Sequence, residues 1–283
     1  MNRSDRKIGS RQRAGALTIG FMAFAIFVGA PVRAAETKEG SKLDRAFLVR
    51  FGRDFQDVIC SPARWDRRDF LTLTVVSGTG LVLFAFDQDI RTWAEDHRTS
   101  TSDKASSFFS FLGDGTTLVG LSAAIYAAGE IGHDFGLRRT ALLSLESLAA
   151  ASIVAWTIKV IAGRARPYTD ESSRSFHPFA FKNSYWSLPS GHAIASFSVA
   201  TAIAEQTESP LVDVLAYSLA TLVGISRIHE NKHWAADVFF GSAIGYFVAK
   251  KICDLNRRRD GSGISLGLDC AGGRRALTLN IAF

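Results

Sequence analysis

The chain has 283 residues, of which 47% are hydrophobic, and this is ample for a sizeable core in one large domain. Its formal net charge of +6 suits nucleic acid, an anionic membrane surface or a phosphorylated substrate, and charge alone does not choose among them. Three widely spaced cysteines, Cys60, Cys253 and Cys270, form no CxxC pair and have no histidine at a zinc-ligand spacing, which argues against a metal site and against any disulfide framework beyond one long-range bridge.

The first 34 residues have the layout of a secretory signal peptide. Five basic residues, Arg3, Arg6, Lys7, Arg11 and Arg13, precede an apolar run over residues 14–32. The run ends at Val32-Arg33-Ala34, which predicts cleavage near Ala34. The alternative is an uncleaved N-terminal anchor, because such runs overlap the roughly 20 residues that a spanning helix needs. Both interpretations direct the chain to a membrane.

The rest of the chain predicts an all-α fold. A charged lead-in segment covers residues 35–69, with an amphipathic piece near residues 43–58, and a polar loop is expected over residues 87–104. Six apolar stretches predict a six-helix bundle within residues 70–252, with helices at 70–86, 116–128, 140–158, 192–204, 211–225 and 238–249. Glycines, prolines and charge clusters mark the breaks between them.

The C-terminal tail, residues 253–283, alternates apolar and polar residues near its end. This pattern predicts a small β-hairpin between residues 264–268 and 276–283. The last segment resembles the final strand of outer-membrane barrels, but one hairpin cannot close a barrel, so an ordinary surface strand is favoured.

The sequence leaves the membrane topology open. Most of the apolar stretches are shorter than about 17 residues, and Glu146 and Asp213 lie inside two of them, which suits buried core helices. If all six helices span, the basic clusters lie on one side, in agreement with the positive-inside rule. A cleaved signal peptide would reverse that topology, so the two signals conflict.

Three polar groups follow or precede the predicted helices, and the first is Lys159 with Arg166. Arg166 lies seven positions after Lys159 and directly before Pro167, which forces it off the helix. A lysine and a forked arginine that approach from different directions can clamp a phosphoryl group. The alternative is a pair of basic residues that complements a helix C-terminus.

The second group is Pro189-Ser190-Gly191-His192, at the start of an apolar helix. Serine is expected to cap the helix and glycine to let an anion approach the backbone, so the free N–H groups and the helix dipole would bind phosphate. His192 would then be placed to protonate a leaving oxygen. The alternative is a capped helix with a surface histidine.

The third group contains Arg227, His233 and Asp237. His233 and Asp237 are four positions apart, so we expect them on one helix face and within hydrogen-bond reach. The carboxylate would fix the imidazole tautomer and leave the other nitrogen as a nucleophile or base. The alternative is a structural His–Asp pair. In an antiparallel bundle all three groups would lie at one end.

The motifs Lys-x6-Arg-Pro, Pro-Ser-Gly-His and Ser-Arg-x5-His-x3-Asp resemble the signature of the type 2 phosphatidic acid phosphatase and vanadium haloperoxidase superfamily, over roughly residues 70–249. The resemblance implies a helical phosphatase domain that needs no metal or other cofactor. His233 would attack phosphorus, Asp237 would orient it, and His192 would protonate the leaving group. The phosphoryl oxygens would be held by Lys159, Arg166, Ser190, Gly191 and Arg227. The pattern gives no role to Arg164 or His229, which are expected to be solvated loop residues.

We therefore expect an exported enzyme of the bacterial cell envelope that hydrolyses a phosphomonoester or pyrophosphate. The favoured substrate is a lipid such as phosphatidate, a prenyl pyrophosphate or lipid A, with a membrane rather than nucleic acid as the partner and a site that faces the periplasm. A soluble periplasmic acid phosphatase acting on small phosphate esters is one alternative, in line with the mean hydropathy of +0.10. The others are a vanadium-dependent haloperoxidase and a non-catalytic protein that binds anionic lipid.

Overall fold

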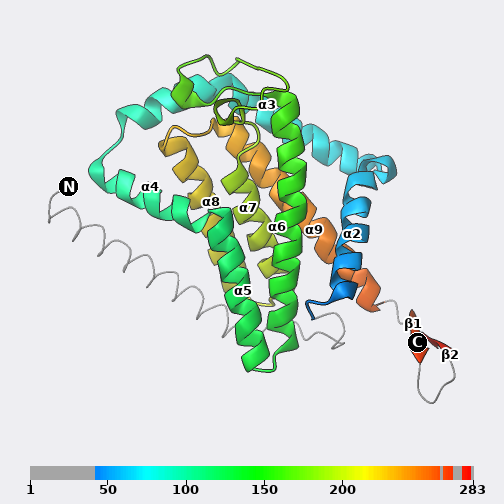
Figure 1. Cartoon of the computed structure of the whole chain (residues 1–283). Coiled ribbons are helices and arrows are strands. Elements are labelled where there is room, and N and C mark those ends of the chain that lie inside the picture. Colours follow the sequence, from blue (N-terminus) through cyan, green and yellow to red (C-terminus); the bar gives the residue numbers. More distant parts are fainter. Residues whose placement is uncertain (1–41, 262–263, 270–275, 282–283) are drawn as a thin grey trace.

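The computed structural model describes residues 42–261, 264–269 and 276–281 (Figure 1). The signal peptide or anchor predicted at residues 1–34 lies outside the described residues. The described α-helices are α2 (Arg45–Cys60), α3 (Arg67–Asp96), α4 (Ser100–Leu112), α5 (Gly115–Ile131), α6 (Phe135–Ala162), α7 (Gly191–Gln206), α8 (Pro210–His229) and α9 (Ala235–Gly261). The expected all-α domain is confirmed, but the count of six helices within residues 70–252 is wrong, because seven described helices, α3 to α9, cover this region, while α2 lies in the lead-in segment.

The polar loop expected over residues 87–104 is mostly helical. α3 continues to Asp96, and α4 begins shortly afterwards at Ser100. Thr99 starts α4 with a capping box: its side chain accepts a hydrogen bond from the Ser102 backbone, and the Ser102 hydroxyl accepts one from the Thr99 backbone. Polar residues therefore mark a helix start here, where the prediction had a loop.

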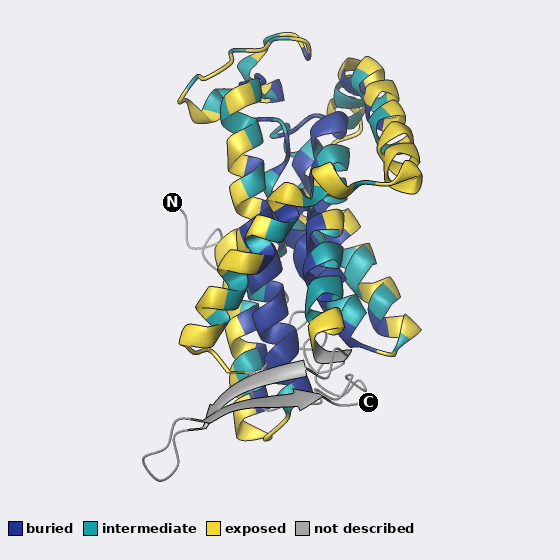
Figure 2. Ribbon diagram, turned by 90° about the vertical axis from the view of Figure 1, so that its right-hand side faces the viewer, coloured by how far each residue is buried: buried dark blue, intermediate teal, exposed yellow. Residues whose placement is uncertain are grey.

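Helix α7 lies at the centre of the bundle, where it packs against α6, α8 and α9. Two glycines let α9 approach it closely. A Cβ atom on Gly241 would lie 2.7 Å from the Ser190 carbonyl oxygen, and one on Gly245 would lie 2.5 Å from that of Ile194. Only glycine fits at this spacing, so the N-termini of α7 and α9 are held side by side. Figure 2 shows the buried residues gathered along this central part of the bundle.

Helix α3 runs across the end of the bundle that carries the loop between α6 and α7 (Figure 1). Gly80 and Asp87 are its buried residues, and its apolar side chains are largely exposed. Gly80 meets the ring of Phe240 on α9. This crossing brings Asp87 to the N-terminal end of α9.

By length and composition, three described helices are apolar enough to cross a membrane: α3, α6 and α8. The bent pair of α4 and α5, with an angle of 56° between them, would make a fourth span if it acts as one broken helix. In the described chain this is fewer than the six spans considered from the sequence. α7 owes its central place to small buried side chains such as Ala193, Ala200 and Ala202.

Two short strands follow α9. β1 (Ile264–Asp269) and β2 (Ala276–Ile281) pair antiparallel, with Ile264 opposite Ile281 and Asp269 opposite Ala276. They lie in the tail where the alternating pattern occurs. A sheet of two strands cannot close a barrel, so the tail adds a small appendage to the helical domain.

Candidate active site

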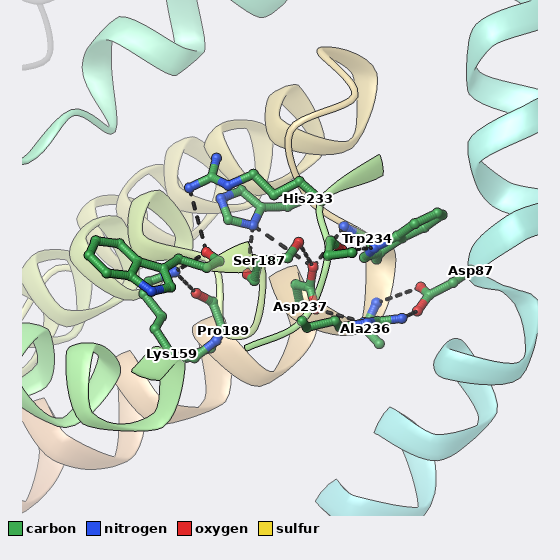
Figure 3. Close-up of polar contacts among 12 residues, drawn as sticks. Asp87, Lys159, Ser187, Pro189, His233, Trp234, Ala236 and Asp237 are labelled. Atoms are coloured by element: carbon green, nitrogen blue, oxygen red, sulfur yellow. Dashed lines mark hydrogen bonds and ion pairs between the residues drawn. The ribbon is translucent and has the colours of Figure 1, made fainter. Parts of the chain in front are cut away.

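The three polar groups meet where α6 ends, α7 begins and the α8–α9 loop enters α9 (Figure 3). The Lys159 ammonium group donates hydrogen bonds to the carbonyl oxygens of Pro189 and, at 2.9 Å, Trp186. The backbone N–H of Ser190 donates to the Asp237 carbonyl oxygen at 2.9 Å. These bonds connect all three groups at one end of the bundle.

His233 is buried, and its Nδ1 atom lies 2.8 Å from the backbone carbonyl oxygen of Ser187. A carbonyl oxygen only accepts hydrogen bonds, so Nδ1 carries the proton and Nε2 keeps its lone pair. The expected direct hydrogen bond to Asp237 is wrong, because Nδ1 lies 3.9 Å from Asp237 Oδ2. His233 precedes the first residue of α9, Ala235, so the helical spacing of four does not apply to this pair.

Asp237 acts on His233 through Ser187 instead. The Ser187 hydroxyl donates to Asp237 Oδ2 at 2.5 Å, and the same oxygen accepts the Trp234 backbone N–H at 3.0 Å. Burial alone would raise the pKa of Asp237, but the neighbouring His233, the charge of Arg164 and the Ser187 hydroxyl lower it to about 2. The carboxylate is therefore ionised at neutral pH.

The same surroundings keep His233 neutral. Burial, together with the charges of Lys159 and Arg166, lowers its pKa to about 3, against the opposing effect of Asp237. At neutral pH the ring is uncharged and Nε2 is free to act as a nucleophile or base.

The arginines are each oriented by neighbouring groups. Arg166 donates from Nε to the Asn183 carbonyl oxygen and from Nη2 to the Asn183 side chain, both at 2.9 Å. Arg227 donates from Nη1 to Glu230 at 2.6 Å and to the Ser110 hydroxyl. Its Nε is buried without a hydrogen-bond partner, which leaves a donor to be satisfied by a ligand or solvent.

The start of α7 offers further unused groups. Ser190 occupies the N-cap position, but its hydroxyl makes no cap hydrogen bond and is buried without a partner, so the expected serine cap is wrong. Around Gly191 an added Cβ would meet only Lys159, at 4.0 Å. An anion could therefore reach the first N–H groups of α7 from this open side.

His192 is also surrounded by positive charge. Burial and, after it, the charge of Arg227 lower its pKa to about 4. Asp114 opposes this shift, and Arg166 and Lys159 add to it. The charges of Arg166 and Lys159 therefore act on both histidines. In the described chain no cluster of three His, Cys, Asp or Glu side chains could hold a metal ion.

Arg164 is the residue that the sequence missed most clearly. It was expected in a solvated loop, but it is fully buried. Its Nη1 donates to Asp237 Oδ1 and its Nη2 to Asp87 Oδ2, both at 2.6 Å. His229 is not a solvated loop residue either. It is the last residue of α8, and its Nε2 lies 3.0 Å from Oδ1 of Asp103 on α4.

A groove of about 570 Å³ leads away from the site. Gly191 and His192 line one part of it, and Phe47, Leu48 and Phe51 of α2 line another. The remaining walls come from the α4–α5 junction, α5, α6 and α7: Gly113, Gly115, Val119, Leu145, Glu146, Leu148, Ala149, Ser152 and Ala195. The lining is mostly apolar, and His192 and Glu146 are its ionisable members.

The fold and site together define a class: a helical bundle that holds a buried, uncharged histidine near several basic side chains and the N-terminus of a helix. Residues 140–259 match the model of the PAP2 superfamily.

Among curated proteins, a lipid A 1-phosphatase from Porphyromonas gingivalis is 43% identical over 66 residues, which cover 23% of this chain and 15% of that protein. The chain therefore aligns with only a small part of this relative. Two solved structures share the fold. A transmembrane PAP2-type phosphatidylglycerolphosphate phosphatase from Bacillus subtilis superposes with a TM-score of 0.52 at 21% identity, over 65% of this chain and 96% of that one. LpxE from Aquifex aeolicus superposes with a TM-score of 0.50 at 18% identity, over 60% of this chain and 95% of that one.

Proposed function

We propose that this protein is a phosphatase that removes a phosphoryl group from a phosphomonoester or pyrophosphate, with a phosphorylated lipid as the substrate. The observation that carries the proposal is the hydrogen bond from His233 Nδ1 to the Ser187 carbonyl, which leaves Nε2 unprotonated beside a cationic site. We assign the chemistry to a domain over residues 70–252, with residues 1–34 serving in export or anchoring, 35–69 as a lead-in and 253–283 as a tail.

The first step forms a phosphohistidine. His233 Nε2 attacks phosphorus, the bond from phosphorus to the leaving oxygen breaks, and His192 gives that oxygen a proton. Negative charge grows on the non-bridging oxygens in the transition state. A set of preoriented donors would stabilise it, namely Lys159, Arg166, Arg227, the Ser190 hydroxyl and the N–H groups near Gly191.

The second step regenerates the enzyme. A water molecule attacks phosphorus, the bond from phosphorus to His233 Nε2 breaks, and the proton of the water passes to His192. Inorganic phosphate leaves, and both histidines return to their starting states. His192 is largely neutral in the empty site, with a pKa of about 4. A bound phosphate dianion opposes the surrounding cations and would raise this pKa, so substrate binding itself prepares the acid.

A lipid substrate is supported by the groove. It begins at His192 and is walled by apolar side chains from α2, α5 and α6, which suits an acyl chain better than water. The names of the relatives, which include a lipid A 1-phosphatase and a phosphatidylglycerolphosphate phosphatase, agree with this class. We place the protein in the bacterial cell envelope, with the site facing the periplasm.

The test is phosphate release by the purified protein from a panel of lipid and soluble phosphates. We expect turnover of lipid phosphates and a loss of at least about a thousandfold in His233→Ala, because the nucleophile is removed. His192→Ala should lose less with aryl phosphates, whose leaving groups need no proton. Unchanged phosphate release by His233→Ala would reject the proposal, and activity on soluble esters alone would reject the lipid substrate.

A further inference from the structure

We propose that Asp87 and Arg164, neither of which is a fixed position of the three motifs, are positioning residues for the phosphoryl transfer by His233. This inference rests on the proposed function and adds to it a chain of buried contacts from α3 to the nucleophile. The chain runs from Asp87 through Arg164 to Asp237, and from there through Ser187 to His233 (Figure 3).

The guanidinium group of Arg164 spans two carboxylates. Its Nη1 reaches Asp237 and its Nη2 reaches Asp87, each at 2.6 Å, and all three side chains are sealed from solvent. Nε and Nη2 also donate to the Ser173 carbonyl oxygen, at 3.0 and 2.7 Å. The planar fork of arginine suits this geometry, whereas a lysine could not reach both carboxylates.

The two carboxylates also fix the start of α9. Asp87 Oδ1 accepts the Ala236 backbone N–H at 2.9 Å, and Asp237 Oδ2 accepts that of Trp234 at 3.0 Å. These N–H groups would otherwise be unsatisfied at a helix N-terminus, where the helix dipole also favours negative charge. His233 is the residue directly before Trp234, so its backbone position follows from both contacts.

Arg164 also holds the residue that sets the His233 tautomer. Its carbonyl oxygen accepts the Ser187 backbone N–H at 3.1 Å. The Ser187 side chain is bound to Asp237, and its carbonyl oxygen accepts from His233 Nδ1. Ser187 is therefore tied to Arg164 directly and through Asp237. A shift of Arg164 would move the acceptor that orients the imidazole.

Charge gives Asp87 a second role. When Nε2 bonds to phosphorus while Nδ1 keeps its hydrogen, the imidazole ring becomes positively charged. Two carboxylates and one guanidinium carry a net negative charge, because Asp87 shares the positive charge of Arg164 with Asp237. The field of Asp237 therefore remains available to stabilise the charged ring as it forms. Without Asp87, Arg164 would neutralise Asp237 alone.

The test compares Asp87→Asn and Arg164→Lys with wild type, using a soluble aryl phosphate. Asparagine keeps the shape of Asp87 and an acceptor for Ala236 but removes the charge. We expect kcat to fall about 10- to 100-fold, the range for outer partners of an oriented histidine, with KM within about twofold. Arg164→Lys keeps one charge in the buried site but breaks the span between the carboxylates, and should lose at least as much.

Two inhibitors and a matched control variant distinguish a positioning role in phosphoryl transfer from a purely structural role. Vanadate mimics the pentacoordinate transition state, so its inhibition constant should rise by the same factor as 1/kcat, while that of inorganic phosphate stays within about twofold. The control is Asp54→Asn, which neutralises another fully buried carboxylate, bound to Arg259 away from the site. It should lower the melting temperature and leave kcat unchanged.

The inference is overturned if folded Asp87→Asn keeps the kcat of wild type. It is also overturned if this variant loses affinity for vanadate and for inorganic phosphate by the same factor. If Asp87→Asn does not fold, Arg164→Lys decides alone by the same two criteria. An inactive wild type, or an active His233→Ala, would instead reject the proposed function, so the two failures are distinguishable.

Discussion

The two ends of α9 each hold a buried aspartate and an arginine, but they are built differently. At the N-terminal end, Asp87 and Arg164 come from other elements and neither is exposed. At the C-terminal end, Asp54 of α2 meets Arg259 of α9 itself, and the Arg259 side chain is 40% exposed. Solvent reaches the Arg259 side chain, whereas Arg164 is sealed from it. The sealed network lies beside His233, and the partly exposed pair joins α2 to the C-terminal end of α9.

The largest difference should appear when each arginine is removed. Arg164→Ala leaves two buried carboxylates unpaired, so we expect it to lower the free energy of unfolding by about 3–5 kcal/mol. Arg259→Ala should cost about 1 kcal/mol, because solvent screens that partly exposed pair. Denaturation of both variants in the same detergent measures the difference. Equal losses would show that burial does not distinguish the two ends.

A lower pH should destabilise the N-terminal end of α9 more than the C-terminal end, because the buried His233 lies at the N-terminal end. The pKa of folded His233 is about 3, against 6.5 for the free side chain, so the unfolded chain binds more protons between these values. This contribution to stability is present above pH 6.5 and is lost as the pH falls toward 3, by up to about 1.4 kcal/mol per pH unit.

Between pH 7 and pH 5, the free energy of unfolding of wild type and of Arg259→Ala should therefore fall by about 2 kcal/mol more than that of His233→Gln. Unfolding measured at the two pH values tests this expectation. His192 remains in all three proteins, so its own titration cancels in the comparison. Parallel pH profiles for wild type and His233→Gln would mean that His233 is not held neutral by burial.

The groove runs between the two ends of α9 that are compared above, from His192 toward the α2 helix that carries Asp54. Ala149→Trp should fill it and raise KM for a long-chain lipid phosphate by about tenfold, with kcat for a soluble aryl phosphate unchanged. Ala124→Trp, at an exposed alanine of α5 that does not line the groove, is the matched control. Equal effects of both variants on the lipid would remove the groove from substrate binding.

The convergence of the three polar groups could be predicted because each lies at a helix end, and helix ends meet in an antiparallel bundle. Asp87 and Arg164 could not be found this way. Asp87 follows an apolar run and looks like the start of a loop, and Arg164 lies among other polar residues after α6. Their partnership joins positions 77 residues apart, which only tertiary packing specifies.

Two of the sequence predictions, the His233–Asp237 contact and the end of α3, were wrong for reasons that lie close to these residues in the chain. The His233–Asp237 contact was predicted from helical spacing, but the helix begins only after His233, and the Ser187 carbonyl takes the hydrogen bond instead. A helix end at residue 86 is too early, because the sequence pattern does not distinguish a buried Asp87 from a solvated charge. A lone carboxylate directly after a long apolar stretch was the available signal, since such a group is costly unless it is paired.

The most direct test of the central claim, that His233 attacks phosphorus, is a rapid-quench reaction with a radiolabelled aryl phosphate. The quenched protein is digested and the labelled peptide is sequenced. We predict an acid-labile, base-stable phosphoryl label on His233, which accumulates further in His192→Ala because the second step lacks its base. Turnover of the substrate with no label on His233 at any time, or with the label on another residue, would contradict the account.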